Sequence, residues 1–374
     1  MTDVTVDLAG LAGFELDLRD MGAGFVSNAS RYLPVTGLPA GTSGLMGTLA
    51  TPLEKFRSAV STALQADRTA IDTFGTNLAT VALGYRSTVD GTANAVTAAT
   101  APLGASGAPA SSGEQGVHRF GGLQLPSLPD VPELQNAIRQ VVTSAIAQIQ
   151  VYDDAFATVI GKRPAADYLT PLVADWEALQ AIGQRISWIG INDYVTSENL
   201  VNGTRWLHSS WTGEASQAFG NSTGALAQSI AGRSIDLDAV SKIVENGGIV
   251  LERLVYNQAV GLSASILQTI THKQASFPLG VWATLIGNPM PESLRSQISS
   301  ALDELTNTAE ARHTAITTTA RTLSGAVEYS PGRNAPVYDP SGFEVPEKVV
   351  VDPGVAKYGF GDNVWWQESN ASAG

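Results

Sequence analysis

The residue types that carry most protein chemistry are few and scattered in this chain of 374 residues. It has no cysteine, which excludes disulfides, zinc–thiolate sites and thiol catalysis. The acid pairs Asp153-Asp154 and Asp236/Asp238 are expected to lie in solvent, on helix surfaces or turns. No phosphate-binding glycine loop, nucleophile elbow or metal triad occurs, so we expect no catalytic residue, cofactor or metal. Four histidines lack metal-ligand spacing and are expected to be surface or packing residues: His118, His208, His272 and His313.

The net charge of the chain disfavours some classes of binding partner. The formal net charge is −13, and Lys and Arg total only 22 without forming a run. Nucleic-acid binding needs clustered basic residues, so no nucleic acid is expected, and binding to an anionic membrane by charge is not expected for the same reason. The opening MTDVTVDLAGLAGF is not typical of a secretory signal peptide. No uncharged apolar run reaches the roughly 20 residues that would span a bilayer.

Hydrophobic periodicity predicts helices throughout the first 100 residues. Apolar residues recur at steps of three or four from Val4 to Tyr32, which forms one stripe on a helix. Prolines and glycines between Pro34 and Gly44 then break the pattern. A second stripe runs from Leu49 to Val89 with a nearly heptad spacing. Two long helices joined by a short break predict an N-terminal antiparallel hairpin over residues 1–100.

The rest of the chain divides by composition. Residues 101–130 are rich in Gly, Pro, Ser and Ala, which predicts a linker. Residues 131–330 predict a helical domain, and residues 331–374 predict an extended, partly disordered tail with room for one short strand pair. The apolar stretch FPLGVWATLIGNPMP interrupts the later helices. The expected helices of the domain run from about Pro132 to Ile160 and from about Asp167 to Leu207, the second with or without a break around residues 190–192. Helix-like sequence then continues from Glu214 through Leu267 until the apolar stretch interrupts it, and a last helix runs from about Glu292 to Leu323.

The segment from Asp175 to Gly232 carries the most informative pattern. It contains Trp211-Thr212-Gly213-Glu214-Ala215, with matching positions before and after: Asp175-Trp176, Asn199-Leu200, Gly203, Leu207 and Phe219. In this register the segment resembles the Trp-Xaa-Gly (WXG) helical-hairpin superfamily of actinobacterial type VII (ESX) secretion substrates. The resemblance covers about residues 165–245, and more loosely the helices up to about residue 325.

The resemblance implies that Trp211 and Gly213 form the turn between two antiparallel helices. Glycine permits the tight bend, and a buried indole ring can fix how the helix ends cross. Glu214 would then lie in the first turn of the next helix, where a carboxylate favours the helix dipole. The alternative is a core Trp in an ordinary helix turn. The two interpretations predict the same structure and differ on export.

The first hairpin is similar to the short ESX-secretion-associated proteins that lack Trp in their turn. The sequences VDLAGLAGFELDLRDMGAGF and LPAG carry this likeness. Single-hairpin members of the superfamily commonly pair into four-helix bundles. An isolated hairpin would leave an apolar stripe in water, at about 25 cal/mol per Å². We therefore expect the two hairpins of this chain to pack on each other.

The family's export signal is Tyr-x-x-x-Asp/Glu in or after a terminal helix. Tyr358 and Asp362 have this spacing and are the favoured candidates, although the glycines between them are not helical. An aromatic tail patch that folds back onto the bundle is the alternative for these residues. Tyr194 and Glu198 also fit, but lie inside a hairpin helix and are expected to be coincidental. Tyr85, at the end of the first hairpin, has its acid one residue too far away at position 90.

Together these patterns predict an all-α protein with two long antiparallel helical hairpins packed as an elongated bundle, additional helices and an extended C-terminal tail. The expected function is that of a non-catalytic type VII substrate or associated protein that acts by protein–protein interaction. Its expected partners are the secretion machinery or a small WXG-type protein. It would be cytoplasmic before export, and then secreted or held in the cell envelope.

Three alternatives remain from the sequence. The chain could be a cytoplasmic chaperone or adaptor for another secreted substrate. It could be an effector with envelope or membrane activity, for which the apolar stretch of residues 249–290 is the candidate segment. It could also be an enzyme whose active site has no recognisable motif. The oligomeric state is not indicated by the sequence.

Overall fold

Helices make up most of the protein, as the sequence predicts. The computed structural model describes residues 5–100, 116–123, 128–132, 137–333 and 335–350, with the helix backbone alone for residues 90–100. The longer helices are α1 Leu8–Tyr32, α3 Ala50–Thr100, α4 Ala137–Ile149, α5 Asp153–Ile160, α6 Ala178–His208, α7 Glu214–Leu267, α8 Leu279–Leu285 and α9 Glu292–Val327. The short elements are α2 Gly44–Gly47, the turns η1 Leu33–Val35, η2 Gln150–Tyr152, η3 Ala165–Leu169, η4 Thr170–Leu172 and η5 Pro340–Phe343, and the strands β1 Thr269–His272 and β2 Ala275–Pro278.

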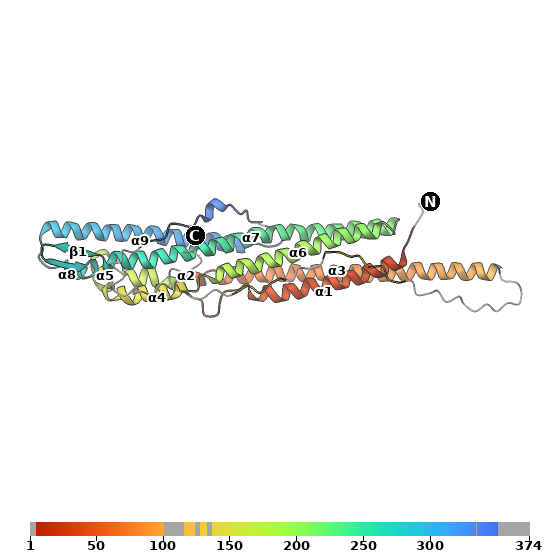
Figure 1. The fold of residues 1–374 in the computed structure, drawn as a ribbon, viewed down its shortest axis with the longest axis horizontal. Helices are drawn as coiled ribbons and strands as arrows, with labels where there is room; N and C mark the ends of the chain where they lie inside the picture. Colours follow the sequence, from red (N-terminus) through yellow and green to blue (C-terminus); the bar gives the residue numbers. More distant parts are fainter. Residues whose placement is uncertain (1–4, 101–115, 124–127, 133–136, 334, 351–374) are drawn as a thin grey trace.

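Two helical hairpins form an elongated bundle (Figure 1). The α1/α3 hairpin packs along α6, and α6 and α7 form the second hairpin. The expected packing of the two hairpins on each other is therefore confirmed. The helix α7 continues beyond this four-helix region, where α9 runs back along it and α4 packs against it. Within the described part of the chain, no helix has both the length and the hydropathy to cross a membrane.

The start and the stripe of α1 follow directly from its residues. Asp7 caps the helix, because its carboxylate accepts a hydrogen bond from the Ala9 backbone N–H at 3.0 Å. Leu11, Phe14 and Leu18 are fully buried at the predicted helical spacing. Pro34 then follows the helix and cannot donate a backbone hydrogen bond, which favours the end of the helix here.

Two predicted helices have different boundaries in the structure. The helix expected from Pro132 to Ile160 is divided into α4 and α5 by the 3-10 turn η2. The helix expected from Asp167 begins only at Ala178, after a π-turn and a 3-10 turn. Pro171 has no N–H to donate and Val173 has ψ 88°, outside the helical region, so the helical pattern is interrupted before α6.

The two strands of the structure do not lie in the tail, where the sequence left room for one short pair. Among the described tail residues no paired strand is present, whereas β1 and β2 form a hairpin between α7 and α9. The helix α7 ends at Leu267, where the β-branched residues Thr269, Ile270 and Thr271 follow and begin β1. The apolar stretch itself supplies the last two residues of β2, the helix α8 and the residues that lead to α9.

Parts of the linker and the tail lie on the bundle as extended segments. Asn199 of α6 holds Leu123, donating to its carbonyl and accepting from its N–H, both at 2.8 Å. Asn257 of α7 holds the tail in the same way, donating to the Glu347 carbonyl and accepting from the Val349 N–H at 2.8 Å. Two buried amides thus satisfy main-chain groups that extended segments would otherwise leave unpaired.

Candidate functional site at the Trp-Xaa-Gly turn

The connection between α6 and α7 is a tight turn that needs a glycine. The helix α6 ends at His208, and the Trp211 N–H still donates to the Leu207 carbonyl at 3.0 Å. Gly213 then adopts φ 103° and ψ −179°, a conformation that is essentially open only to glycine. The next helix begins at Glu214, which lies in its first turn as the resemblance implies.

The Trp211 side chain is buried against α7 and α3. Its exposed fraction is 2%, and its ring centroid lies 5.8 Å from that of Phe219 on α7. Its indole N–H points to the Tyr85 hydroxyl of α3 at 3.5 Å, and Ser216 Oγ donates to its carbonyl at 2.7 Å. Trp211 therefore connects the turn to the other hairpin as well as to its own helices. Tyr85, weighed as an export residue, lies within this cluster.

The N-terminal segment also pairs with the turn. Val6 and Trp211 form an antiparallel β-bridge. The Thr212 N–H donates to the Thr5 carbonyl and the Asp7 N–H donates to the Ser210 carbonyl, each at 3.0 Å. The start of the first hairpin is thus tied to the turn of the second by main-chain hydrogen bonds. No residue pattern indicates this pairing, because it rests on backbone groups that every sequence carries.

Aromatic side chains fill the space beneath the turn. Phe14 of α1 contacts the rings of Phe219, Trp206 and Phe120 at centroid distances of 6.3 to 6.4 Å. A Cβ at Gly203 would lie 2.3 Å from the Phe14 ring, so only glycine allows this approach. The turn-end cluster consists of Leu11, Phe14, Leu18, Met21, Ile71, Leu78, Leu200, Leu207, Trp211, Phe219, Ala227 and Ile230.

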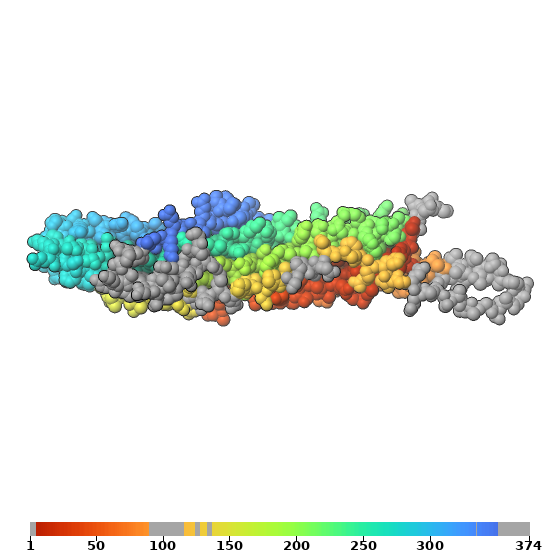
Figure 2. Space-filling model, viewed as in Figure 1, coloured from red at the N-terminus to blue at the C-terminus, as the bar shows by residue number. Residues whose placement is uncertain are grey.

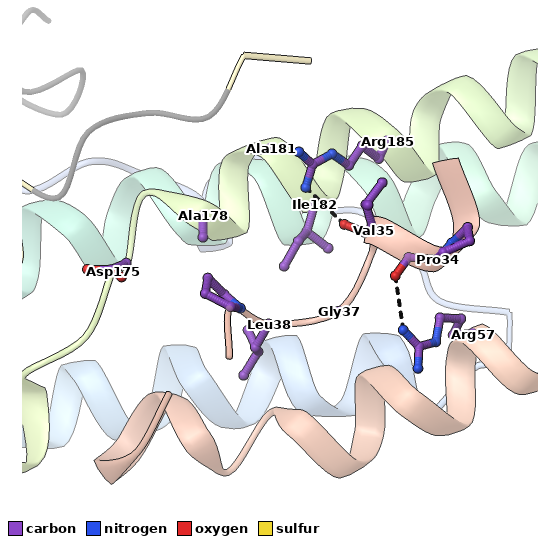
Figure 3. Close-up of a pocket in the computed structure, with 11 residues that line it drawn as sticks. Pro34, Val35, Gly37, Leu38, Arg57, Asp175, Ala178, Ala181, Ile182 and Arg185 are labelled. Carbon is purple, nitrogen blue, oxygen red and sulfur yellow. Dashed lines mark hydrogen bonds between the residues drawn. The ribbon is translucent and has the colours of Figure 1, made fainter. Parts of the chain in front are cut away.

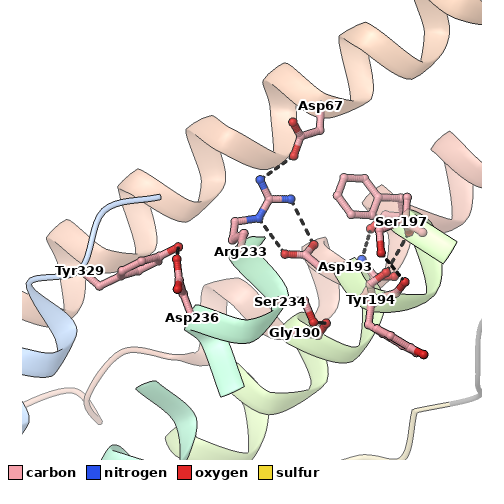
Figure 4. Close-up of polar contacts among 12 residues, drawn as sticks. Asp67, Gly190, Asp193, Tyr194, Ser197, Arg233, Ser234, Asp236 and Tyr329 are labelled. Carbon is pink, nitrogen blue, oxygen red and sulfur yellow. Dashed lines mark hydrogen bonds and ion pairs between the residues drawn. The ribbon is translucent and has the colours of Figure 1, made fainter. Parts of the chain in front are cut away.

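A buried polar layer lies between this cluster and the main hydrophobic cluster (Figure 4). On α7, Arg233 follows Ile230 of the turn-end cluster and precedes Leu237 of the main cluster. Its guanidinium donates to both carboxylate oxygens of Asp193 on α6, at 2.7 and 3.2 Å, and pairs with Asp67 of α3. The layer therefore joins three helices and both hairpins.

Burial and the neighbouring charges shift the pKa values of the groups in this layer. Burial would lower the pKa of Arg233, but the carboxylates of Asp193 and Asp67 outweigh it and raise that pKa. Burial also raises the pKa of Asp193, to about 6, against the pull of Arg233. All three side chains have small exposed fractions, with 11% for Asp67 as the largest. A substrate could not reach these groups, so the arrangement serves to align helices.

Two surface pockets offer room for a ligand. The larger, of about 450 Å³, lies between η1, α3 and α6 (Figure 3). Arg57 and Arg185 border it, and each donates to a carbonyl of the η1 turn, that of Pro34 and that of Val35 respectively. The smaller, of about 270 Å³, lies beside Arg119. Arg119 donates to Asp17 and pairs with Asp20 at the edge of the smaller pocket, so these carboxylates are held in ion pairs.

The export candidates occupy different places. Tyr358 and Asp362 lie outside the described residues. Tyr194 is exposed on α6, and Glu198 lies one turn further along the same face. No group of three metal-ligand side chains is close enough to hold an ion within residues 5–100, 116–123, 128–132, 137–333 and 335–350.

The turn around Trp211 and Gly213 is therefore the candidate functional feature. It brings together residues from both hairpins, and it does so by packing and by main-chain pairing rather than by reactive groups. Sequence reasoning identified the turn and its glycine but missed the polar layer, whose acids are far apart in the chain. No family model, no curated protein and no solved structure matches this chain.

Proposed function

We propose that this protein is a substrate or associated protein of a type VII (ESX) secretion system and acts through protein–protein contact without catalysis. The observation that carries the proposal is the turn, in which the buried Trp211 and the positive-φ Gly213 join two antiparallel helices. The WXG superfamily uses this combination at this place. Gly203, another matching position, is needed for the close approach of Phe14.

The bundle also indicates which faces a partner could use. The apolar stripe of α6 and α7 at this end is covered by α1 and α3 of the same chain. A small WXG-type partner that paired in the usual four-helix manner would have to displace this hairpin. The secretion machinery, contacting outer surfaces, is therefore the partner that the packing favours.

Export is the property that tests the proposal. We expect the chain in the culture filtrate of its native cell when the secretion ATPase is active, and only in the cell fraction when that ATPase is deleted. A cytosolic protein of known abundance serves as the lysis control. Detection in the cytosol alone, with the ATPase present, would contradict the proposal and favour the cytoplasmic chaperone or adaptor.

The tail signal has a separate test with a matched control. Tyr358→Ala and Asp362→Asn are expected to abolish export and leave the helical content unchanged. Tyr194→Ala has the same chemistry on an exposed helix face and is expected to leave export unchanged. Normal export of both tail variants would reject Tyr358 and Asp362 as the signal.

A further inference from the structure

The connection between α7 and α9, residues 268–291, forms one end of the elongated molecule. It contains β1, β2 and α8, which lie at the left end in Figure 1 and are uncovered in Figure 2. We call it the tip. Lys273 is its only residue among Asp, Glu, Lys and Arg, in a chain with a formal net charge of −13. The tip is therefore an uncharged to weakly basic surface on an acidic protein.

The β-hairpin places the single cation at its apex. His272 pairs with Ala275 in the antiparallel register, so Lys273 and Gln274 form the two-residue turn. Lys273 has φ 55°, and among the described residues it is the only non-glycine with a positive φ. Asn or Gly would adopt this conformation at lower cost. A strained residue at an exposed apex is a reason to look for a function.

The same hairpin exposes a large apolar side chain. Phe277 has an exposed fraction of 42%, whereas Ile270, its cross-strand partner, is buried. Among the described residues, no other Phe or Trp is classed as exposed. Leu285 on α8 adds a second exposed apolar side chain at 36%. Such groups cost free energy in water unless a partner surface covers them.

The base of the tip holds Phe277 in place. The Trp282 ring meets the Phe277 ring edge-on, with centroids 5.3 Å apart. Trp282 is itself buried, and its indole N–H donates to the Ile270 carbonyl at 2.9 Å. The Leu279 N–H donates to the Gln268 carbonyl at 2.9 Å, which closes the hairpin onto α8. Phe277 thus packs on Trp282 with part of its ring while the rest is exposed to solvent.

We propose that the tip docks end-on onto an anionic lipid surface. Phe277 and Leu285 enter the interface to a shallow depth, and Lys273 contacts the acidic headgroups. Charge favours this orientation, because the acidic body is repelled by an anionic bilayer and the tip carries no acid. Hydroxyl side chains of Thr271 and Ser276, which share a hydrogen bond at 2.8 Å, suit the polar headgroup layer.

The structure also limits the depth of this contact. In the apolar stretch of residues 249–290, the part up to Leu267 belongs to α7, and Val250, Leu251 and Val255 are buried in the core. Those side chains could enter a bilayer only if the bundle opened. Docking by the tip needs no such change and is reversible, since only two apolar side chains enter the interface.

Vesicle flotation of the full chain tests the proposal. The protein is mixed with vesicles of phosphatidylcholine containing phosphatidylglycerol, or of phosphatidylcholine alone, and floated through a density gradient at low salt. We expect co-flotation with the anionic vesicles and little with the neutral ones. Phe277→Ser should reduce the bound fraction at least about fivefold, and Lys273→Glu about tenfold. Phe277→Trp should retain binding.

The control places the same type of change on the body of the bundle. Ile235 on α7 is 72% exposed, so Ile235→Ser removes a more exposed apolar side chain far from the tip. It should float like the wild type, and circular dichroism should show equal helical content in all variants. Flotation that is absent in the wild type, or equal in the Phe277→Ser and wild-type proteins, overturns the proposal. So does concentration-dependent self-association that Phe277→Ser abolishes, because a second copy would then be the occupant.

Discussion

The two ends of α7 are connected to their neighbouring helices in opposite ways. The turn before it uses Gly213 at φ 103° and buries Trp211 to 2% exposure. The tip after it uses Lys273 at φ 55° and leaves Phe277 42% exposed. Each connection therefore has one positive-φ residue and a large aromatic side chain, and the tip also buries a second aromatic residue, Trp282. At the turn, the glycine and the burial of Trp211 favour stability. At the tip, the positive φ of Lys273 and the exposure of Phe277 oppose it.

This difference distinguishes a connection that packing explains from one that exposes side chains to a partner. A buried aromatic ring and an unstrained glycine are what packing alone would select. An exposed aromatic ring and a strained lysine in one hairpin have no such explanation within the fold, and strained residues are found where strain accompanies function. The comparison thus indicates that the turn holds the fold together and that the tip is a contact surface.

The largest effect is expected at the turn. Trp211→Ala should lower the free energy of unfolding by about 3–5 kcal/mol, because it removes a buried indole from the turn-end cluster. Urea unfolding followed by circular dichroism measures the change. Ile235→Ser, on an exposed face, should change it by less than about 0.5 kcal/mol. Equal small effects in both variants would mean that Trp211 does not hold the hairpins together.

The region between the two ends should contribute a pH dependence of its own. Burial raises the pKa of Glu177 to about 7 from 4.5, while a hydrogen bond from the Ile138 N–H opposes the shift. A pKa raised in the folded state means that stability is lost as the pH rises from about 4.5 through 7. Glu177→Gln should remove this loss, a gain of about 3 kcal/mol at pH 8.

Unfolding of both proteins between pH 4 and pH 8 checks this sign. The difference between wild type and Glu177→Gln should be small at pH 4 and should grow as the pH rises. The pH dependence that remains in the variant reports on other groups and cancels in the difference. A constant difference across the range would show that Glu177 does not change protonation there.

Much of this fold could be predicted from local patterns. The stripes from Val4 to Tyr32 and from Leu49 to Val89 indicate α1 and α3, because burial at helical spacing is a local property of the sequence. The late start of α6 could not be predicted in this way. Between the π-turn and α6 the backbone leaves the helical region at Val173, with ψ 88°, although the apolar spacing continues through Leu172 and Trp176.

The candidate site shows the same division. Trp211 and Gly213 are recognisable because the tight turn requires a glycine and the large aromatic residue lies two positions before it. The polar layer could not be found, because Asp67, Asp193 and Arg233 lie on three helices and only their register brings them together. An isolated Arg or Asp on a helix is, without that register, indistinguishable from a solvated residue.

A smaller effect is expected for the turn glycine. Gly213→Ala places a Cβ on a residue with φ 103° and should cost about 1–3 kcal/mol. Gly232→Ala within α7, where a Cβ would meet no atom within 4 Å, should instead stabilise by about 0.5–1 kcal/mol. Thermal unfolding of the pair measures the contrast. Stabilisation by both substitutions would contradict the strained turn geometry.

The smallest effect is expected at the tip, where a substitution of Lys273 tests whether this residue lowers stability but is needed for binding. Lys273→Asn should raise the free energy of unfolding by about 0.5–1 kcal/mol, because Asn adopts φ 55° more easily than Lys. The same variant should bind anionic vesicles less, since it removes the only cation of the tip. A stabilised protein with weaker flotation would show that the lysine is kept for its charge. A variant that is stabilised and floats as well as the wild type would leave the strained apex without that explanation, and the contrast between the two ends of α7 would then rest on Phe277 alone.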